Sequence, residues 1–283
     1  MRFLEVVRAG PLTTVQDAGR PGLAHLGIPR SGAVDLPALR QANQLVGNPS
    51  DHAGLEITLT GAVLRPTAPV TVAIAGAPAT VTIDGGAAEW GAAVAVPAGA
   101  TLKIGPARRG VRTYLAVAGG IEVDPVLGSR STDVLAGLGP PVIRDGDRLP
   151  LGDPVGAPAS HRLTPPEHSA VLRVRLGPRD DWFTPDAIAT LFSAEYTVSP
   201  TSNRIGVRLT GPPLPRAIEG ELPSEGLVTG AIQVPAGGQP LVFLADHPTT
   251  GGYPVIGVVA GDDLPIVAQA RPGTKLRFQR YGD

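Results

Sequence analysis

Short apolar runs separated by glycine and proline dominate this chain. The runs are rich in β-branched residues, and turn-forming residues interrupt them at intervals of about ten positions, which is the spacing of sandwiches and barrels. Strands are predicted at 55–59, 70–75, 80–83, 92–96, 111–117, 171–176, 207–209, 231–234, 241–244 and 255–259. In three similar segments, 97–104, 145–151 and 271–278, a glycine turn precedes a short alternating run, and each predicts a further strand. The pattern therefore predicts a mostly β protein.

Three short helices are predicted among these strands. Asp35 can cap a helix that begins at residue 36 and ends before Gly47. Thr184 followed by Pro185 is a typical N-terminal pair for a helix over 186–194. A shorter helix over 264–268 follows two aspartates.

The segment 152–169 has weak periodicity and many Pro, Gly and Ala residues, which is typical of a linker. We therefore predict two barrel-like domains. The N-terminal β domain covers 1–155, a linker covers 156–168, and a C-terminal β-barrel covers 169–283.

Composition narrows the function classes. A net charge of −1 provides no field for binding nucleic acid or an anionic membrane, and the absence of cysteine excludes disulfides, thiolate metal sites and a cysteine nucleophile. The sequence contains no P-loop motif, no zinc-protease motif and no nucleophile-elbow motif. Its five histidines show no metal-ligand spacing, so no metal site is predicted. The first residues lack a signal-peptide pattern, and we expect a cytoplasmic protein.

Candidate chemistry lies in polar loops, of which 246–254 is the densest. An acid, two threonines, a glycine pair and a tyrosine follow directly after the apolar run 241–244. The glycines permit positive φ and close backbone approach, as in ligand-binding loops. The alternative is a tight polar connection between two strands.

A second polar loop spans residues 13–32. Gln16 and Asp17 offer acceptors, while Arg20 and Arg30 can each hold a carboxylate or a phosphate through two hydrogen bonds. The alternative is a structural ion pair between Asp17 and one arginine.

Two further segments bring polar groups to strand ends. The run 199–206 contains Asn203 and Arg204, although Asx and Ser/Thr turns explain such a run equally well. The run 225–235 contains Glu225 and Gln233, and the Gln233 amide needs a partner if it is buried.

These motifs together resemble one family. They are Gly10-Pro-Leu-Thr-Thr-Val-Gln-Asp17 and the runs 29–35, 45–49, 55–56, 129–133, 145–147, 202–206 and 246–254. The chain resembles the carboxyltransferase subdomain A/B family, which includes allophanate hydrolase subunit 2, KipA-like proteins and the C subunit of 5-oxoprolinase. The resemblance covers almost all 283 residues.

The resemblance implies a cyclophilin-like β-barrel and a subunit of an ATP-dependent 5-oxoprolinase that opens 5-oxo-L-proline to glutamate. It implies a KipI-like partner, also called allophanate hydrolase subunit 1, and a LamB/YcsF-like third subunit. ATP with Mg²⁺ would be shared with these partners. The alternatives are a carboxyltransferase component of a biotin-dependent, urea-carboxylase-like system and a KipA-like regulatory protein. Neither Lys103 nor Lys275 lies beside a methionine, so we expect no covalently attached biotin on this chain.

Onto this sequence the resemblance and the polar loops place a composite site. The predicted catalytic residues are Asp17, Arg30, Asp246 and Tyr253. The predicted substrate-binding residues are Gln16, Arg20, Ser31, Asn203, Arg204, Glu225, Gln233, Thr250, Gly251 and Gly252. Many family members carry Arg-Gln where His247-Pro248 stands here, so these two positions are not assigned chemistry.

Overall fold

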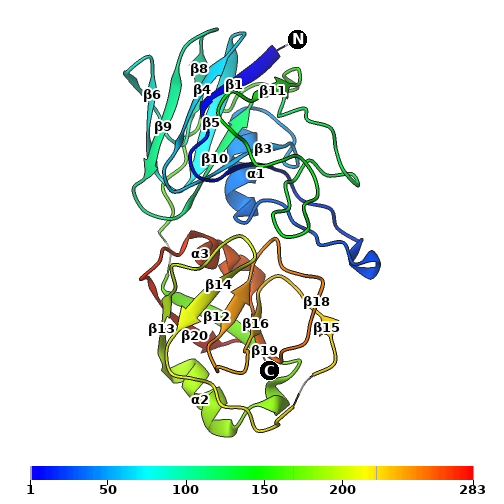
Figure 1. The fold of residues 1–283 in the computed structure, drawn as a ribbon. Helices are drawn as coiled ribbons and strands as arrows, with labels where there is room; N and C mark the ends of the chain where they lie inside the picture. Colours follow the sequence, from blue (N-terminus) through cyan, green and yellow to red (C-terminus); the bar gives the residue numbers. More distant parts are fainter. Residues whose placement is uncertain (1, 168, 221, 283) are drawn as a thin grey trace. The chain divides into compact units, whose positions relative to one another are not determined.

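The computed structural model describes residues 2–167, 169–220 and 222–282 (Figure 1). It divides into two compact units. The first contains Met1–Arg20 and Ser31–Pro166, and the second contains Pro21–Arg30 and Glu167–Asp283. The change of unit at 166/167 falls inside the predicted linker 156–168, whose residue 168 lies outside the described residues. The assignment of 21–30 to the second unit was not expected from the sequence.

Two antiparallel sheets form the first unit. The six-stranded sheet has the order β11-β1-β4-β9-β6-β7, and the five-stranded sheet has the order β2-β3-β10-β5-β8. The strands of the first sheet are β1 (Arg2–Arg8), β4 (Ala62–Pro66), β6 (Ala79–Ile83), β7 (Gly86–Ala88), β9 (Leu102–Ala107) and β11 (Arg148–Leu151). Those of the second are β2 (Thr13–Gln16), β3 (Gly54–Thr58), β5 (Val70–Gly76), β8 (Ala93–Val96) and β10 (Arg112–Val117).

The core of this unit lies between the two sheets. Leu4 and Leu64 of one sheet belong to the same buried cluster as Leu55 and Ile74 of the other. Such packing makes the unit a sandwich of two sheets rather than a closed barrel. The mostly β prediction is confirmed, while the barrel form is confined to the second unit.

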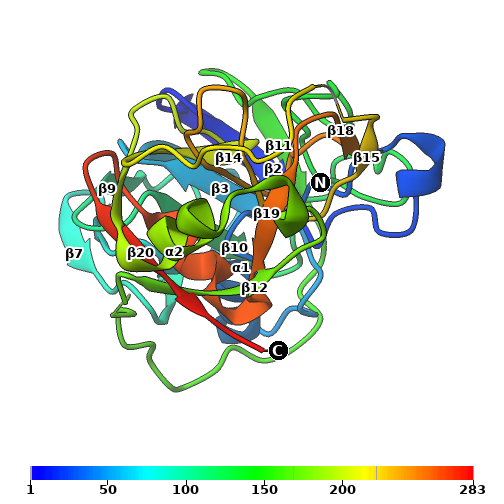
Figure 2. The ribbon, with the colours of Figure 1, turned by 90° about the horizontal axis from the view of Figure 1, so that it is seen from below.

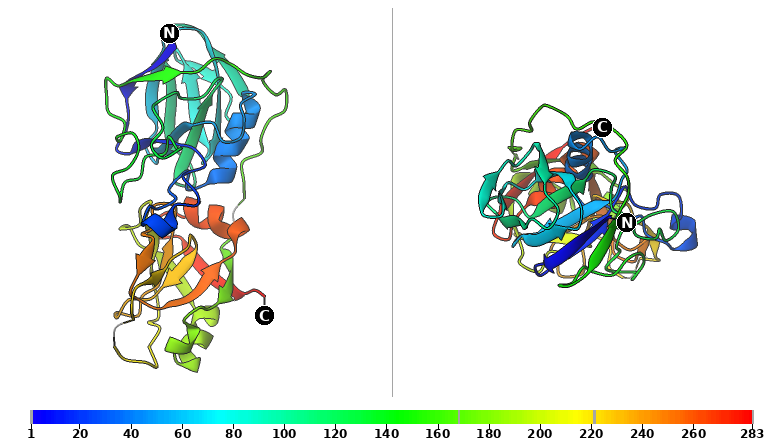
Figure 3. Two further views of the ribbon diagram at one scale, coloured as in Figure 1. Left: turned by 90° about the vertical axis from the view of Figure 1, so that its right-hand side faces the viewer. Right: turned by 90° about the horizontal axis from the view of Figure 1, so that it is seen from above.

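Helix α1 (Leu36–Leu45) covers the outer face of the five-stranded sheet, and Figure 3 shows it lying along the strands. The Asp35 carboxylate caps it by accepting from the Ala38 N–H at 3.2 Å. Alternate residues of β5 face opposite sides, so Ala73 and Ala75 pack with α1 while Ile74 enters the core. The small alanines allow the helix to approach the sheet closely.

The second unit is a closed barrel with the strand order β12-β19-β16-β17-β14-β13-β20. Its strands are β12 (Val171–Leu176), β13 (Glu195–Val198), β14 (Gly206–Thr210), β16 (Ala231–Gln233), β17 (Leu241–Phe243), β19 (Val255–Val259) and β20 (Lys275–Arg280). The barrel closes through the parallel pair β12–β20. A separate two-stranded sheet pairs β15 (Glu225–Gly226) with β18 (Thr250–Gly251).

Helices complete the barrel unit. Helix α2 (Pro185–Ser193) begins after Thr184, whose hydroxyl accepts from the Ala187 N–H, and it packs against β20 (Figure 2). Helix α3 is Leu264–Gln269, and the 3₁₀ helices are η1 (Ala24–Leu26), η2 (Asp180–Trp182) and η3 (Gly261–Asp263). None of the helices in the described part of the chain is long and apolar enough to cross a membrane.

The ten strands predicted from short apolar runs are all present, with ends that differ by no more than one residue. The segments 97–104, 145–151 and 271–278 contain the starts of β9, β11 and β20, which begin three to five residues later than predicted. The strands that were missed include β1, β2, β4 and β13. The predicted linker is ordered along the first unit, where the Ala159 N–H donates to the Leu45 carbonyl and the Leu163 N–H donates to Gly91. The Ala159 and Leu163 side chains also pack against the buried cluster that contains Leu45, but two isolated apolar residues form no periodic pattern in the sequence.

A buried tyrosine fixes the chain that enters α1. The Tyr114 hydroxyl donates to Glu56 Oε2 at 2.7 Å and accepts from the Asp35 N–H at 2.8 Å. Glu56 Oε2 also accepts from the Val34 N–H at 2.9 Å. Burial and the nearby charges of Glu56 and Asp35 raise the pKa of Tyr114 well above its ordinary value.

A matched pair of Tyr→Phe substitutions tests this network. Tyr114→Phe should lower the free energy of unfolding by about 1–3 kcal/mol, because it leaves the Asp35 N–H without its partner. Tyr196 is equally buried in the barrel, but its hydroxyl has no hydrogen-bond partner among the described residues, and burial raises its pKa to about 12. Tyr196→Phe should therefore cost nothing or be stabilising. Calorimetric unfolding of both variants measures the difference, and equal losses would contradict the network.

An acid at the end of η3 gives the barrel a pH dependence. Asp263 accepts from the Arg173 N–H at 2.7 Å and from Arg173 Nη2 at 2.7 Å, and these bonds hold its pKa below the ordinary value. A lowered pKa stabilises the fold above the unfolded value of about 3.9, and the contribution is lost as pH falls through the folded value. Asp263→Asn should therefore lower the melting temperature at pH 7, and the difference from wild type should narrow below about pH 4. The exposed neighbour Asp262, changed to Asn, is the control and should have little effect.

Candidate functional site

Four of the five predicted residues of the 13–32 loop meet the segment 129–133 in the first unit. Asp17 is the centre of this cluster and is mostly buried. Its Oδ1 accepts from the hydroxyls of Ser129 at 2.6 Å and Ser131 at 2.5 Å, and from the Gly19 N–H at 2.8 Å. Its Oδ2 accepts from the Arg130 N–H at 2.6 Å. Both oxygens are therefore held by protein donors, and the geometry gives Asp17 a positioning role.

Gln16 and Arg20 attach to two consecutive carbonyls of the same segment. Arg20 Nη2 donates to the Ser131 carbonyl at 2.6 Å, and Gln16 Nε2 donates to the Thr132 carbonyl at 2.9 Å. The Ser31 hydroxyl donates to the same Thr132 carbonyl at 3.2 Å. Four predicted residues are thus brought together on one short stretch of chain.

Close packing holds Arg20 against this stretch. A Cβ at Gly139 would lie 2.0 Å from the Ser131 carbonyl oxygen and 3.1 Å from Arg20 Nη2, so only glycine fits there. Ser31 has a φ of 53°, in the left-handed region, and the Ala33 N–H that follows donates to the Asp17 carbonyl at 3.0 Å. The loop is therefore held in one conformation from both sides.

Arg30 does not join the cluster. Its side chain is exposed and makes no hydrogen bond or ion pair with any described residue. The alternative of a structural ion pair with Asp17 is also wrong for the described chain, because neither Arg20 nor Arg30 contacts that carboxylate. Serine hydroxyls and backbone amides take the place of the arginine.

In the second unit Asp246 and Arg204 form a fully buried ion pair. Arg204 Nε and Nη2 donate to Asp246 Oδ2 and Oδ1, both at 2.9 Å, and the two side chains are 1% and 0% exposed. The Asp246 N–H also donates to the Arg204 carbonyl at 3.1 Å. Asp246 is therefore the counter-charge of Arg204 within the fold. Both of its carboxylate oxygens accept from Arg204, so the structure does not show it in the position of a proton donor or acceptor for a ligand.

Asn203, beside this pair, shapes a turn. Its Oδ1 accepts from the Ile205 N–H at 2.9 Å and from the Gly206 N–H at 3.3 Å. This is the Asx turn that the sequence offered as the alternative.

The remaining predicted residues gather at the two-stranded sheet. Glu225 pairs with Gly251 and Gly226 pairs with Thr250, while Gln233 Nε2 donates to the Tyr253 carbonyl at 3.0 Å. A Cβ at Gly251 would lie 2.8 Å from Gln233 Nε2, so the backbone approaches that amide closely. The buried Gln233 amide thus has the partner that the sequence required.

Two arginines that the sequence did not single out flank this sheet. Arg179 forms an ion pair with Glu225, which lowers the pKa of that carboxyl. The guanidinium of Arg216 lies 5.7 Å from the ring centroid of Tyr253, whose side chain is exposed. Arg216 also lines a cavity of about 410 Å³ with Glu219 and the glycines at 237 and 238. The arrangement suits recognition of a polar ligand, although the cavity lining does not include Tyr253.

A metal centre was not predicted, and the described residues hold no group of three or more His, Cys, Asp and Glu side chains that could bind one. The predicted composite site draws on both units. Asp17, Gln16, Arg20 and Ser31 belong to the first, whereas Arg30 and all predicted residues from Asn203 to Tyr253 belong to the second.

Comparison with known proteins decides the family. The model of the carboxyltransferase domain, subdomain A and B, matches residues 26–280. The chain belongs to this family. Its resemblance to the family, inferred from the motifs, is thereby confirmed.

Relatives within the carboxyltransferase-domain family differ greatly in length. The chain is 39% identical to the C subunit of 5-oxoprolinase from Escherichia coli, over 98% of this chain and 90% of that protein. It is 33% identical to urea amidolyase of Saccharomyces cerevisiae, over 97% of this chain but 16% of that protein. The crystal structure of Kluyveromyces lactis urea amidolyase superposes with a TM-score of 0.92 at 30% identity, covering 99% of this chain and 19% of that one.

Sequence reasoning treated 129–133 as a family motif and missed it as part of the cluster. The signal was present, since Ser-Arg-Ser-Thr-Asp is a dense polar run between weakly structured segments. Its hydroxyls and amides are the donors that Asp17 requires. Arg179 and Arg216 carried no comparable signal, because their partners are distant in the sequence.

Substitutions at Asp246 and Tyr253, two of the three predicted catalytic residues of the second unit, should distinguish a structural role from a chemical one. Asp246→Asn leaves the Arg204 guanidinium buried without its charge partner and should lower the free energy of unfolding by about 3–5 kcal/mol. Tyr253→Phe alters an exposed side chain and should leave stability within about 0.5 kcal/mol of wild type. Chemical denaturation of the two variants measures both values. An Asp246→Asn variant as stable as wild type would contradict a structural role for the pair.

Proposed function

We propose that this chain is the C subunit of an ATP-dependent 5-oxoprolinase, which opens 5-oxo-L-proline to glutamate. The observation that carries the proposal is the 39% identity to the corresponding 5-oxoprolinase protein of Escherichia coli over nearly the whole of both chains. The protein acts in a complex with a KipI-like subunit and a LamB/YcsF-like subunit, and it is cytoplasmic.

Within that complex the first-unit cluster is the candidate for binding the lactam. Hydrolysis of a cyclic amide requires donors that stabilise the developing oxyanion and acceptors that orient the ring N–H. Arg20, Gln16 and Thr132 supply both kinds of group from one short stretch of the fold. Asp17 holds this stretch in place through Ser129 and Ser131.

The described residues do not form a complete binding site for ATP and Mg²⁺. These residues hold no carboxylate or histidine cluster for a metal, and the carboxylates of Asp17 and Asp246 are engaged by the protein itself. In the proposal the nucleotide and its metal therefore take their main ligands from the partner subunits. This chain contributes the binding and orientation of the organic substrate.

A carboxyltransferase acting on biotin carried by another protein is the second candidate. The TM-score of 0.92 to Kluyveromyces lactis urea amidolyase favours it. The chain spans less than a fifth of that protein, whereas it spans nine tenths of the Escherichia coli 5-oxoprolinase protein. The higher sequence identity to the Escherichia coli 5-oxoprolinase protein, 39% against 30%, supports the first candidate.

Reconstitution tests the proposed function directly. The chain should be purified with its KipI-like and LamB/YcsF-like partners, and 5-oxo-L-proline-dependent ATP hydrolysis and glutamate release should be measured. We expect release of glutamate that stops when this chain is omitted. A complete complex that releases no glutamate would rule out the 5-oxoprolinase function. Carboxylation of urea in the presence of a biotinylated carrier protein, measured in parallel, would support the second candidate.

A further inference from the structure

Three buried polar atoms in the first-unit cluster lack hydrogen-bond partners among the described residues. They are Arg20 Nη1, Gln16 Oε1 and Thr132 Oγ1, and each belongs to a residue that is at most 3% exposed. Buried polar groups without partners are rare in folded proteins, and each requires an explanation. Three of them on neighbouring groups indicate a binding site for one molecule rather than three separate packing faults.

The three atoms are physically linked. Arg20 is bonded to the Ser131 carbonyl through its other terminal nitrogen, and Gln16 is bonded to the Thr132 carbonyl through its amide nitrogen. The third atom is the hydroxyl of Thr132 itself. Ser131 and Thr132 are consecutive, and through their carbonyls and the Thr132 hydroxyl they connect all three unpartnered atoms.

The charge of Arg20 supports the same interpretation. Its guanidinium donates only to the carbonyls of Ser131 and Val126, and no carboxylate among the described residues lies within ion-pair distance. A buried charge without a counter-charge is strongly unfavourable. Arg204 differs in this respect, because Asp246 matches its buried charge.

The donors and acceptors define what would complete the site. A guanidinium nitrogen only donates, an amide oxygen only accepts, and a hydroxyl does either. The complementary molecule therefore offers an anionic or carbonyl oxygen to Arg20 and an N–H to Gln16. Inorganic phosphate supplies an anionic oxygen and a hydroxyl donor but no carbonyl beside an N–H, and an uncharged amide does not neutralise the arginine.

We propose that Arg20, Gln16 and Thr132 form a subsite for a small cyclic amide that carries a carboxylate. The carboxylate binds the Arg20 guanidinium, and the ring N–H donates to Gln16 Oε1. The Thr132 hydroxyl donates to the amide carbonyl. This inference rests on the proposed function and specifies the residues that recognise its substrate.

Ligand discrimination by the full chain tests the subsite. Thermal unfolding and titration calorimetry should compare 5-oxo-L-proline with 2-pyrrolidinone, which lacks the carboxylate, and with inorganic phosphate at matched ionic strength. We expect 5-oxo-L-proline to raise the melting temperature and to bind about tenfold or more tightly than 2-pyrrolidinone, since a charged hydrogen-bonded contact is lost. Phosphate should be no more effective than chloride.

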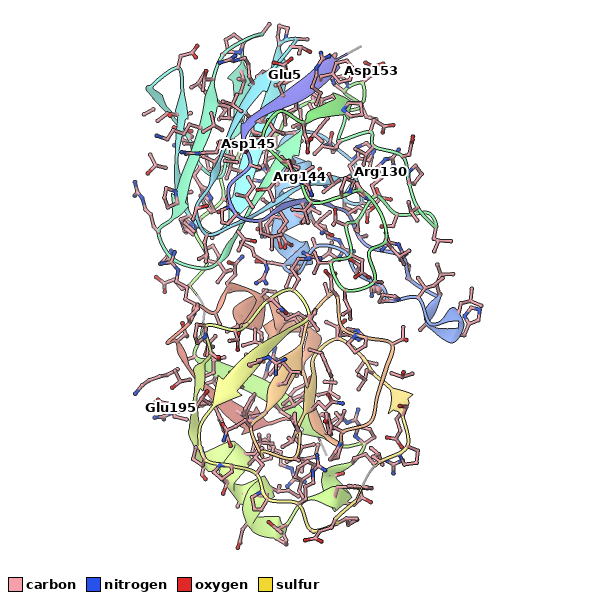
Figure 4. The ribbon with its side chains drawn as sticks, viewed as in Figure 1. Glu5, Arg130, Arg144, Asp145, Asp153 and Glu195 are labelled. Carbon is pink, nitrogen blue, oxygen red and sulfur yellow. The ribbon has the colours of Figure 1, made fainter. Side chains whose placement is uncertain are left out.

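Two variants connect this discrimination to the named atoms. Arg20→Gln should bind 5-oxo-L-proline and 2-pyrrolidinone with similar affinity. Thr132→Val removes a hydroxyl that has no partner among the described residues, so it should fold normally while binding 5-oxo-L-proline several-fold more weakly. Arg144→Gln is the matched control, because Arg144 is an exposed arginine of the same unit (Figure 4).

The outcomes separate this inference from the proposed function. If Thr132→Val and wild type bind 5-oxo-L-proline equally, or if no ligand stabilises the chain, the subsite is wrong. The same conclusion follows if phosphate and 5-oxo-L-proline stabilise the chain equally, as an ordinary anion or ordered water would then fill the site. In the reconstituted complex, glutamate release with an unchanged KM in Thr132→Val would overturn the subsite and leave the proposed function intact. Absence of glutamate with the wild-type complex would overturn the function instead.

Discussion

The carboxylate of Asp17 is the junction on which the first-unit cluster depends. Two serine hydroxyls and two backbone amides donate to its oxygens, and three of these four donors come from residues more than a hundred positions away. A carboxylate satisfied in this way joins an N-terminal strand end to a loop that contains little regular structure. Gln16, Arg20 and Ser31 then attach to the same loop. The Asp17 N–H adds a further bond to the Ser131 hydroxyl, so most of the bonds between residue 17 and this loop pass through the carboxylate.

The buried arginines Arg204 and Arg20 are bound in different ways. Arg204 is bound by Asp246 through two hydrogen bonds, and the pair forms part of the barrel's interior. Among the residues that the structure describes, Arg20 is bound only by carbonyl oxygens, which carry partial charge. An ion pair that is already complete offers a ligand nothing, whereas a guanidinium with an unpaired nitrogen attracts an anion. The charges therefore favour the 16–20 segment as the ligand-binding site over the 246–254 loop, where the sequence is densest in polar residues.

Periodicity predicted most strands because both faces of the central strands are buried and their residues are β-branched or small. Strand β1 was missed because Arg2, Glu5 and Arg8 interrupt its apolar alternation, and β13 because only two of its four residues are apolar. Asp35 and Thr184 identified two helix starts because capping is a local interaction. The cluster around Asp17 was predicted from one side only. Its partners lie more than a hundred residues away in the sequence, and a single sequence does not show which distant residues come into contact.

The assignment of 21–30 to the second unit has a consequence for how this chain can be divided. The path passes from the first unit to the second after Arg20, returns at Ser31, and passes to the second unit again after Pro166. Neither unit is therefore a continuous stretch of sequence. One cut at 166/167 would leave ten residues of the barrel unit attached to the sandwich, so no single cut separates the two units.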